Sequence, residues 1–143
     1  MADDLTVTIS ESVAVQGQTF SQSASHTYSN LYYWTKFIKQ VPADEWTQLY
    51  TASADGTSAD YDNDDIDYVR IKNLHSTYAT QVGIFTDSSY HYFAIPAGGF
   101  YIIQNHSELI DDSSSLKDII SVKAGQASNA LNVEVFIALN ALD

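Results

Sequence analysis

The alternation of apolar and polar side chains near the C-terminus is the feature that most limits what this chain can fold into. The apolar residues of this segment occupy every second position: Leu131, Val133, Val135, Ile137 and Leu139. Successive side chains of a β-strand point to opposite faces, so the pattern predicts a strand with one buried face. Segment 5–15 alternates in the same way. Half-buried strands of this kind are typical of antiparallel sheets.

Segments rich in β-branched and aromatic residues predict further strands between these two. They cover residues 27–41, 46–52, 66–73, 80–86, 90–95, 98–104 and 118–123. Turn-forming residues separate them at 42–44, 54–58, 87–89 and 96–99. Helix is expected only around 107–117, as one turn at most. About nine short strands predict one all-β domain over residues 1–143, an antiparallel β-sandwich that is jelly-roll-like. The serine-rich segment 21–29 predicts a flexible or extended arm at the N-terminus, within residues 1–30.

The charge balance excludes several kinds of partner. The chain has 143 residues with 18 acidic and 6 basic side chains, a net charge of −12. Nucleic-acid binding depends on clustered Lys and Arg, and anionic membranes repel an acidic surface, so neither partner is expected. The acidic N-terminus does not resemble a secretory signal, and no segment approaches the roughly 20 apolar residues of a membrane span. The absence of cysteine is consistent with synthesis in a reducing cytoplasm.

The acidic segment 55–67 is the candidate for a cation site. Asp60, Asp62 and Asp64 occupy positions 1, 3 and 5 of an EF-hand register. The register then fails, because Asp65 stands where the loop needs glycine and Ile71 stands where it needs a bidentate glutamate. A looser calcium site on the three aspartates is the alternative to a solvated loop, and the solvated loop is preferred.

No pattern of catalytic residues is found. The four histidines, at 26, 75, 91 and 106, lack the close spacing of a zinc site, and there is no cysteine. Neither a nucleophile elbow nor a phosphate-binding loop is present. The sequence therefore predicts no catalytic residue, no metal, no cofactor and no enzymatic activity.

The aromatic residues are the strongest remaining signal. Ten tyrosines, six phenylalanines and two tryptophans are many for one domain, and around residues 28–50 they fall on both faces of the predicted strands. Tyr and Trp are enriched at interfaces, so we predict Tyr32, Trp34, Phe37 and Trp46 as interface residues. The same side chains stack on sugar rings, which leaves a carbohydrate-binding module open, and a large aromatic core with scattered exposed tyrosines is the third interpretation.

Four segments in a fixed order resemble a known group of proteins. They are DYVRIKNL at 67–74, VGIF at 82–85, FAIPAGGF at 93–100 and VEVFIA at 133–138. Over residues 45–140 this order is similar to the small all-β virion structural proteins of tailed bacteriophages, most of all to capsid decoration (cement) proteins. The shared pattern is structural, so the resemblance implies no catalytic or metal-binding residue.

The resemblance implies a non-enzymatic protein that binds the outer surface of a capsid and stabilises the shell. Its partners would be the major capsid protein or other virion proteins, and it would form a homo-oligomer, with a trimer favoured. It would be made in the host cytoplasm and end on the capsid exterior. The alternatives are a tail, fibre or head–tail connector component, or a carbohydrate-binding β-sandwich module.

Overall fold

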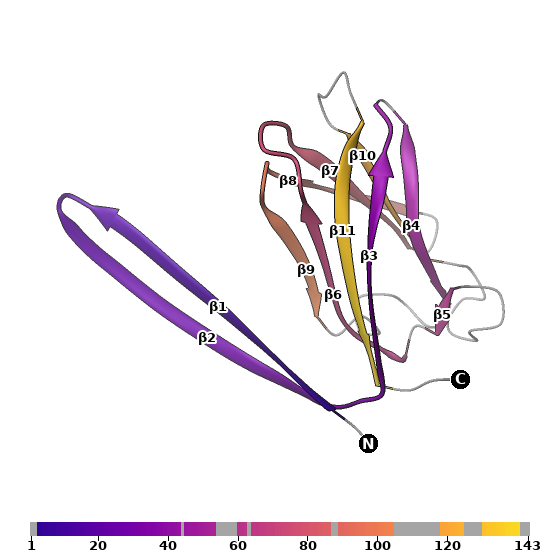
Figure 1. Ribbon diagram of the computed structural model, residues 1–143, viewed down its shortest axis with the longest axis horizontal. Helices are drawn as coiled ribbons and strands as arrows, with labels where there is room; N and C mark the ends of the chain where they lie inside the picture. Colours follow the sequence, from indigo (N-terminus) through magenta and orange to yellow (C-terminus); the bar gives the residue numbers. More distant parts are fainter. Residues whose placement is uncertain are drawn as a thin grey trace.

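The regular structure that the described residues of this protein form is entirely β. The computed structural model describes residues 3–43, 45–53, 60–62, 64–86, 89–104, 118–124 and 130–140. Within these residues there are eleven strands and no helix (Figure 1). The strands are β1 Asp3–Val15, β2 Gln18–Leu31, β3 Tyr33–Val41, β4 Trp46–Ser53, β5 Tyr61–Asp62, β6 Ile66–Asn73, β7 Thr80–Thr86, β8 Ser89–Ile95, β9 Phe100–Gln104, β10 Asp118–Ala124 and β11 Leu131–Leu139. The all-β prediction is confirmed.

Two sheets form a sandwich-like body. One has the strand order β5-β4-β10-β7-β8, and the other has the order β3-β11-β6-β9. Every pairing within them is antiparallel except β4 with β5, which is parallel, so the first sheet is mixed. The sheets face each other across a core of aliphatic side chains with one buried tyrosine. Its largest fully buried members include Tyr50, Ile66, Ile71, Ile95, Ile120 and Ile137.

The predicted alternation of segment 131–139 is confirmed. Val133, Val135 and Ile137 are fully buried in the core, while Asn132 and Glu134 lie on the other side of the strand. β11 pairs with β3 on one side and β6 on the other, so it is an interior strand of its sheet. The apolar side of this strand therefore forms the centre of the core.

The N-terminal strands form a separate sheet that leaves the body. β1 and β2 pair only with each other, as a long antiparallel ribbon that points away from the sandwich (Figure 1). The two residues between them, Gln16 and Gly17, have φ of 51° and 78°. Positive φ at both positions makes a type I′ turn, which matches the twist of the flanking strands. The serine-rich segment 21–29, expected to be flexible or extended, lies within β2. We call this ribbon, residues 3–31, the arm.

One strand prediction is wrong. Segment 27–41 is not a single strand, because β2 ends at Leu31 and β3 begins at Tyr33. Asn30 has φ of 64°, in the left-handed region that asparagine tolerates better than most residues, and the chain changes direction there. The backbone N–H of Tyr32 then donates to the carbonyl of Leu139, at 3.0 Å, which starts the new sheet.

The remaining strand predictions agree with the structure to within two residues, and the turn at 96–99 is confirmed. In that turn the backbone N–H of Gly99 donates to the Pro96 carbonyl at 3.0 Å. The predicted helical turn at 107–117, the whole loop at 54–58 and residues 87 and 88 of the hairpin tip predicted at 87–89 lie outside the described residues. In the described part of the chain, no helix has the length and apolar character to cross a membrane.

Candidate interaction surfaces

The arm has two chemically different faces. Residues directly opposite each other in an antiparallel pair share a face. One face holds mainly apolar pairs: Leu5–Tyr28, Val7–His26, Ile9–Ala24, Glu11–Gln22 and Val13–Phe20. The other holds hydroxyl pairs: Thr6–Thr27, Thr8–Ser25, Ser10–Ser23 and Ser12–Ser21. Two hydroxyl pairs are hydrogen-bonded, Thr6 to Thr27 at 3.0 Å and Thr8 to Ser25 at 2.9 Å. Only the first face has the composition of a surface that becomes buried.

The base of the arm uses its apolar face to pack on the body. Tyr28 and Leu31 of the arm join Tyr68 and Ala138 of the four-stranded sheet in a second, smaller core. The side chains packed around this core are Leu5, Val7, Ile102 and Phe136. The rings of Tyr28 and Tyr68 are 5.6 Å apart. Burial is the main cause that raises the pKa of Tyr28, and the same cause raises the pKa of Tyr68. This packing fixes where the arm leaves the body.

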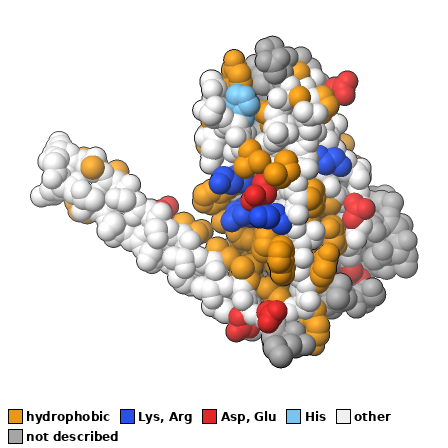
Figure 2. All heavy atoms as spheres, viewed as in Figure 1, with side chains coloured by type: hydrophobic (Ala, Val, Ile, Leu, Met, Phe, Trp, Pro, Cys, Tyr) orange, Lys and Arg blue, Asp and Glu red, His pale blue; other side chains and the backbone are white. Residues whose placement is uncertain are grey.

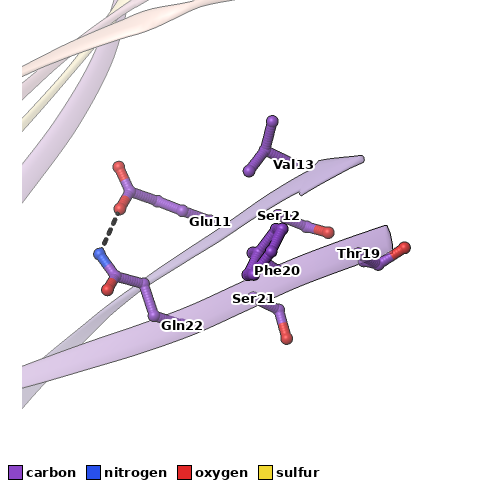
Figure 3. A pocket seen from close by; sticks show the side chains of 7 residues that line it. All are labelled: Glu11, Ser12, Val13, Thr19, Phe20, Ser21 and Gln22. Carbon is purple, nitrogen blue, oxygen red and sulfur yellow. Dashed lines mark hydrogen bonds between the residues drawn. The ribbon is translucent and has the colours of Figure 1, made fainter. Parts of the chain in front are cut away.

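In the distal half of the arm, the same face is not covered by any other described segment. Val13, Val15 and Phe20 are 54%, 51% and 59% exposed. An open hollow of about 770 Å³ lies along this part of the ribbon and is lined by residues of both faces, with Val13 and Ser21 on opposite sides of the ribbon (Figure 3). Its lining residues all come from β1 and β2, and they include Glu11, whose carboxylate accepts a 2.9 Å hydrogen bond from Gln22. A two-stranded ribbon is at best marginally stable alone in water, so this face is suited to a partner.

The second surface is the outer face of the four-stranded sheet, which we call the outer sheet face. Strand register places its side chains in three rows, each crossing β3, β11, β6 and β9. The rows are Trp34–Ala138–Tyr68–Gln104, Lys36–Phe136–Arg70–Ile102 and Ile38–Glu134–Lys72–Phe100. The base of the arm covers part of the first two rows, whereas Ile38 and Phe100 of the third row are 62% and 54% exposed.

Positive charge gathers on the outer sheet face. Lys36, Arg70 and Lys72 are three of the six basic residues of the chain. Arg70 forms an ion pair with Glu134 at 2.9 Å, and its guanidinium lies 5.8 Å from the centre of the Phe136 ring. Within the described residues, Lys36 and Lys72 form no ion pair. Figure 2 shows this cluster of basic side chains around one acidic group, among hydrophobic side chains. The patch contrasts with a net charge of −12.

The third surface is a set of aromatic rings on the outside of the five-stranded sheet. This aromatic row consists of Trp46, Tyr92, Tyr90 and Phe85. The rings of Trp46 and Tyr92 are 5.5 Å apart, and those of Tyr92 and Tyr90 are stacked at 5.7 Å. A Cβ atom on Gly83 would lie 3.1 Å from the Trp46 ring and 3.4 Å from the Tyr92 ring. Because Gly83 has no side chain, the Trp46 ring can lie directly over this position of the sheet.

The structure separates the four predicted interface residues. Tyr32 and Trp34 are each 61% exposed and line one hollow of about 430 Å³ where the arm joins the body, together with Asp3 and Leu5. Phe37 is partly buried and packs against the main core. Trp46 lies on the other sheet, in the aromatic row. Only Tyr32 and Trp34 of the four therefore contribute to the same surface.

Two groups of surface residues escaped the sequence analysis. The distal arm residues Val13 and Phe20 had a usable signal, because two alternating segments flank Gln16 and Gly17, a pair that suits a hairpin turn. The basic cluster of the outer sheet face had no usable signal in the sequence. Its members come from β3 and β6, which are separated by more than twenty residues of sequence and are brought to one face by their pairing with β11.

Two of the three aspartates named as the calcium candidate, Asp60 and Asp62, accept hydrogen bonds through their carboxylates. Asp60 accepts hydrogen bonds from the backbone N–H of Thr51, at 2.9 Å, and from its hydroxyl, at 3.1 Å. Asp62 accepts a 3.0 Å bond from the backbone N–H of Asp64. In the part of the chain that the structure describes, no group of three or more His, Asp or Glu side chains could hold a metal ion. The described carboxylates Asp60 and Asp62 thus hold the backbone beside β4 and β5.

Comparison with models of known protein families and with curated protein sequences finds no match for this chain.

Proposed function

We propose that this chain is a non-enzymatic structural protein of a virion, a capsid decoration protein that binds the outer capsid surface and stabilises the shell. It acts as a homo-oligomer, with a trimer favoured, and its partner is the major capsid protein or another virion protein. It is made in the host cytoplasm and ends on the capsid exterior. The observation that carries this proposal is the arm, a long ribbon whose distal apolar face is not covered by any part of the body that the structure describes.

The strand pairing supports a jelly roll as the architecture of the body. Leaving out the arm and the short β5, the body has eight strands. Its antiparallel pairs join the first strand to the last (β3 with β11), the second to the seventh (β4 with β10), the third to the sixth (β6 with β9) and the fourth to the fifth (β7 with β8). A long hairpin of four strand pairs, rolled into two sheets, produces this pattern. Jelly rolls occur in viral capsid proteins and in lectins.

The energetics of the arm favour a partner with many copies. Full burial of a Val or Phe side chain contributes roughly 1.5–3 kcal/mol, and the distal residues are already about half covered. Burying the rest of Ile9, Val13, Val15 and Phe20 then contributes about 3–6 kcal/mol. Association costs roughly 4–15 kcal/mol, so one arm alone binds weakly. A shell that carries many copies side by side raises the effective concentration of neighbouring copies for each arm, and so favours binding to the assembled state.

Purified particles test this proposal directly. We expect the chain to be present in hundreds of copies per particle by quantitative mass spectrometry. Particles without it should melt at a lower temperature in a thermal-release assay, and adding the purified protein back should restore the melting point. A chain that is absent from particles, or whose removal leaves the capsid melting point unchanged, contradicts the proposal. A dozen copies or fewer would point to the alternative role in a tail, fibre or connector.

The aromatic row favours a second candidate, a carbohydrate-binding module. Tyr90 and Tyr92 are more than half exposed and their planes differ by only 7°, so they can stack on successive sugar rings. A glycan array with the purified protein tests this function. Any hit should be lost in Trp46→Ala and Tyr92→Ala but kept in Trp34→Ala, because Trp34 lies on the other sheet. An array without hits removes the candidate.

A further inference from the structure

We propose that the distal arm of one copy docks, through its apolar face, onto the uncovered part of the outer sheet face of a second copy. This inference deepens the homo-oligomer part of the proposed function by naming its interface, and it rests on that part alone. It does not depend on whether the oligomer then binds a capsid.

The first argument is continuity with a contact that exists in the structure. The base of the arm already buries its apolar face on this sheet, against Tyr68 and Ala138. From Ile9 onward the arm leaves the sheet, and a crevice of about 340 Å³ opens between them. The wall that the sheet contributes includes Lys72 and Phe100. The outer sheet face thus continues beyond the part that its own arm covers.

The second argument is that the two uncovered surfaces have matching chemistry. The distal arm presents Val13 and Phe20, which repeat the aliphatic and aromatic pattern of the base. The outer sheet face presents Ile38, Phe100 and the aliphatic stem of Lys72 in its third row. A second copy therefore offers the distal arm the same kind of surface that the base of the arm contacts on its own body. The hydroxyl face of the ribbon stays in water.

The third argument is charge. Two molecules of net charge −12 repel each other over most of their surfaces. Between residues 5 and 31 the arm has one residue of the Asp, Glu, Lys and Arg types, Glu11, which lies on the apolar face together with His26. The outer sheet face has three cations, Lys36, Arg70 and Lys72, and among the residues that the structure describes only Arg70 of these three forms an ion pair. Contact between the arm and this face therefore brings one carboxylate to unpaired ammonium groups, where two copies attract each other.

The direction of the arm determines the type of interface. Because the arm points away from its own sandwich (Figure 1), its distal half is available to a neighbouring molecule. The contact joins two different surfaces, so it is head-to-tail. Head-to-tail contacts either close into a ring or continue as an open chain. In a ring, the arm of each copy binds the outer sheet face of one neighbour, and the outer sheet face of each copy is occupied by the arm of a neighbour.

Self-association of the full chain tests the apolar part of the interface. We expect wild-type protein to associate in sedimentation equilibrium, and Val13→Ser with Phe20→Ser to weaken that association by about tenfold or more. The matched control is Ser12→Ala with Ser21→Ala, the pair on the hydroxyl face at the same level of the ribbon. The control should associate as the wild type does. Circular dichroism and thermal melting should show an intact body in both variants, because the distal arm lies outside it.

Charge reversal tests the docking site on the sheet. Glu11→Lys alone should weaken association, and so should Lys36→Glu with Lys72→Glu. Combining all three changes in one chain should restore it, because the reversed arm then meets a reversed face. As a control, Lys123→Glu changes a basic residue on the other sheet and should have no effect beyond that of net charge.

Three outcomes would overturn the inference. The first is a wild-type protein that stays monomeric up to about 1 mM. The second is an association that the Val13 and Phe20 variant leaves intact, and the third is a triple charge reversal that fails to restore association. Failure of capsid binding with self-association intact would contradict the proposed function and leave this inference standing.

Discussion

Asn73 shows how one polar residue can organise a sandwich edge. It is fully buried at the end of β6. Its side-chain amide donates to the carbonyls of Tyr78 at 2.8 Å and Pro96 at 3.2 Å, and its Oδ1 accepts from the backbone N–H of His75 at 3.0 Å. One side chain thus joins the segment after β6 to the turn between β8 and β9. A buried polar side chain is tolerated here because both its amide nitrogen and its amide oxygen have hydrogen-bond partners.

Asn73→Ala should destabilise the protein by about 3 kcal/mol, because it leaves buried backbone groups without hydrogen-bond partners. Urea unfolding monitored by tryptophan fluorescence measures the free energy of unfolding. Asn132→Ala, at an exposed position of β11, is the control and should change it by less than about 0.5 kcal/mol. Equal effects of the two substitutions would contradict the role assigned to Asn73.

Asp67 should make folding less favourable as the pH rises. Burial raises the pKa of this carboxyl above its usual 3.8, and the 3.3 Å hydrogen bond from Asn140 only partly offsets it. The folded state therefore holds the proton more tightly than the unfolded state. Stability is lost as the pH rises from the unfolded pKa through the raised pKa of the folded state. Asp67→Asn removes the charge and keeps the acceptor, so its Tm should exceed that of the wild type at pH 7.

The pH dependence of that difference is the control. Near pH 3.8 and below, the wild-type carboxyl is itself protonated in the folded state, so the Tm advantage of Asp67→Asn should shrink. Differential scanning calorimetry of both proteins at pH 7 and pH 3.5 measures this. A Tm advantage of the same size at both pH values would show that burial of the charge is not its cause.

At the scale of elements, the arm and the body depend on different features. The arm is built from local pairing, a two-residue turn and cross-strand hydroxyl contacts. The body is built from strands that are distant in sequence, such as β3 with β11 and β4 with β10. A change in the arm turn should therefore leave the body unaffected.

Gly17→Ala tests this independence. A Cβ atom at Gly17 would contact nothing within 4 Å, so its cost arises only from the left-handed backbone and should be about 1 kcal/mol. Amide hydrogen exchange of residues 10–22 should become about fivefold faster, while the Tm of the body stays unchanged. Gln16→Asn, which favours a type I′ turn, should slow the same exchange. A lower Tm of the body would contradict the independence of arm and body.

At the scale of the whole molecule, the two sides of the four-stranded sheet have different surroundings. Ile137 and Val135 point into the core, whereas Phe136 and Glu134 on the same strand belong to the outer sheet face. The inner side holds the two sheets together. The outer side binds the base of the arm and, by our inference, the arm of a neighbour.

Ile137→Ala should lower the free energy of unfolding by about 2–5 kcal/mol, because it leaves a cavity in a core position with no exposure. Its matched control is Ile38→Ala, on the outer sheet face, where the side chain is largely exposed. That control should leave the free energy of unfolding nearly unchanged and weaken self-association. Chemical denaturation and sedimentation equilibrium on both variants separate the two effects. Similar losses of stability would contradict the assignment of inner and outer sides.

Local pattern was enough to predict most of the strands, their apolar sides and the all-β class. Those features depend on a two-residue period and on turn residues, which sequence displays directly. Leu131 to Leu139 is the clearest example. The break at Asn30 was missed because only the backbone conformation of that residue reveals it. The first half of β2 was missed because its serines and glutamines resemble a loop until their pairing with β1 is known.

The sequence by itself determined that this chain forms half-buried strands with a surplus of aromatic and acidic residues. Only the tertiary structure decided which of those residues share a surface. It packed Phe37 against the core, and placed Trp46 and Trp34 on different sheets and Lys36 in one row with Arg70. The physical reason is that strand pairing between distant segments sets the neighbours of each side chain, and pairing is a property of the whole fold. A two-residue period shows which side chains share one side of a strand, but it does not show which residues each side contacts in the fold.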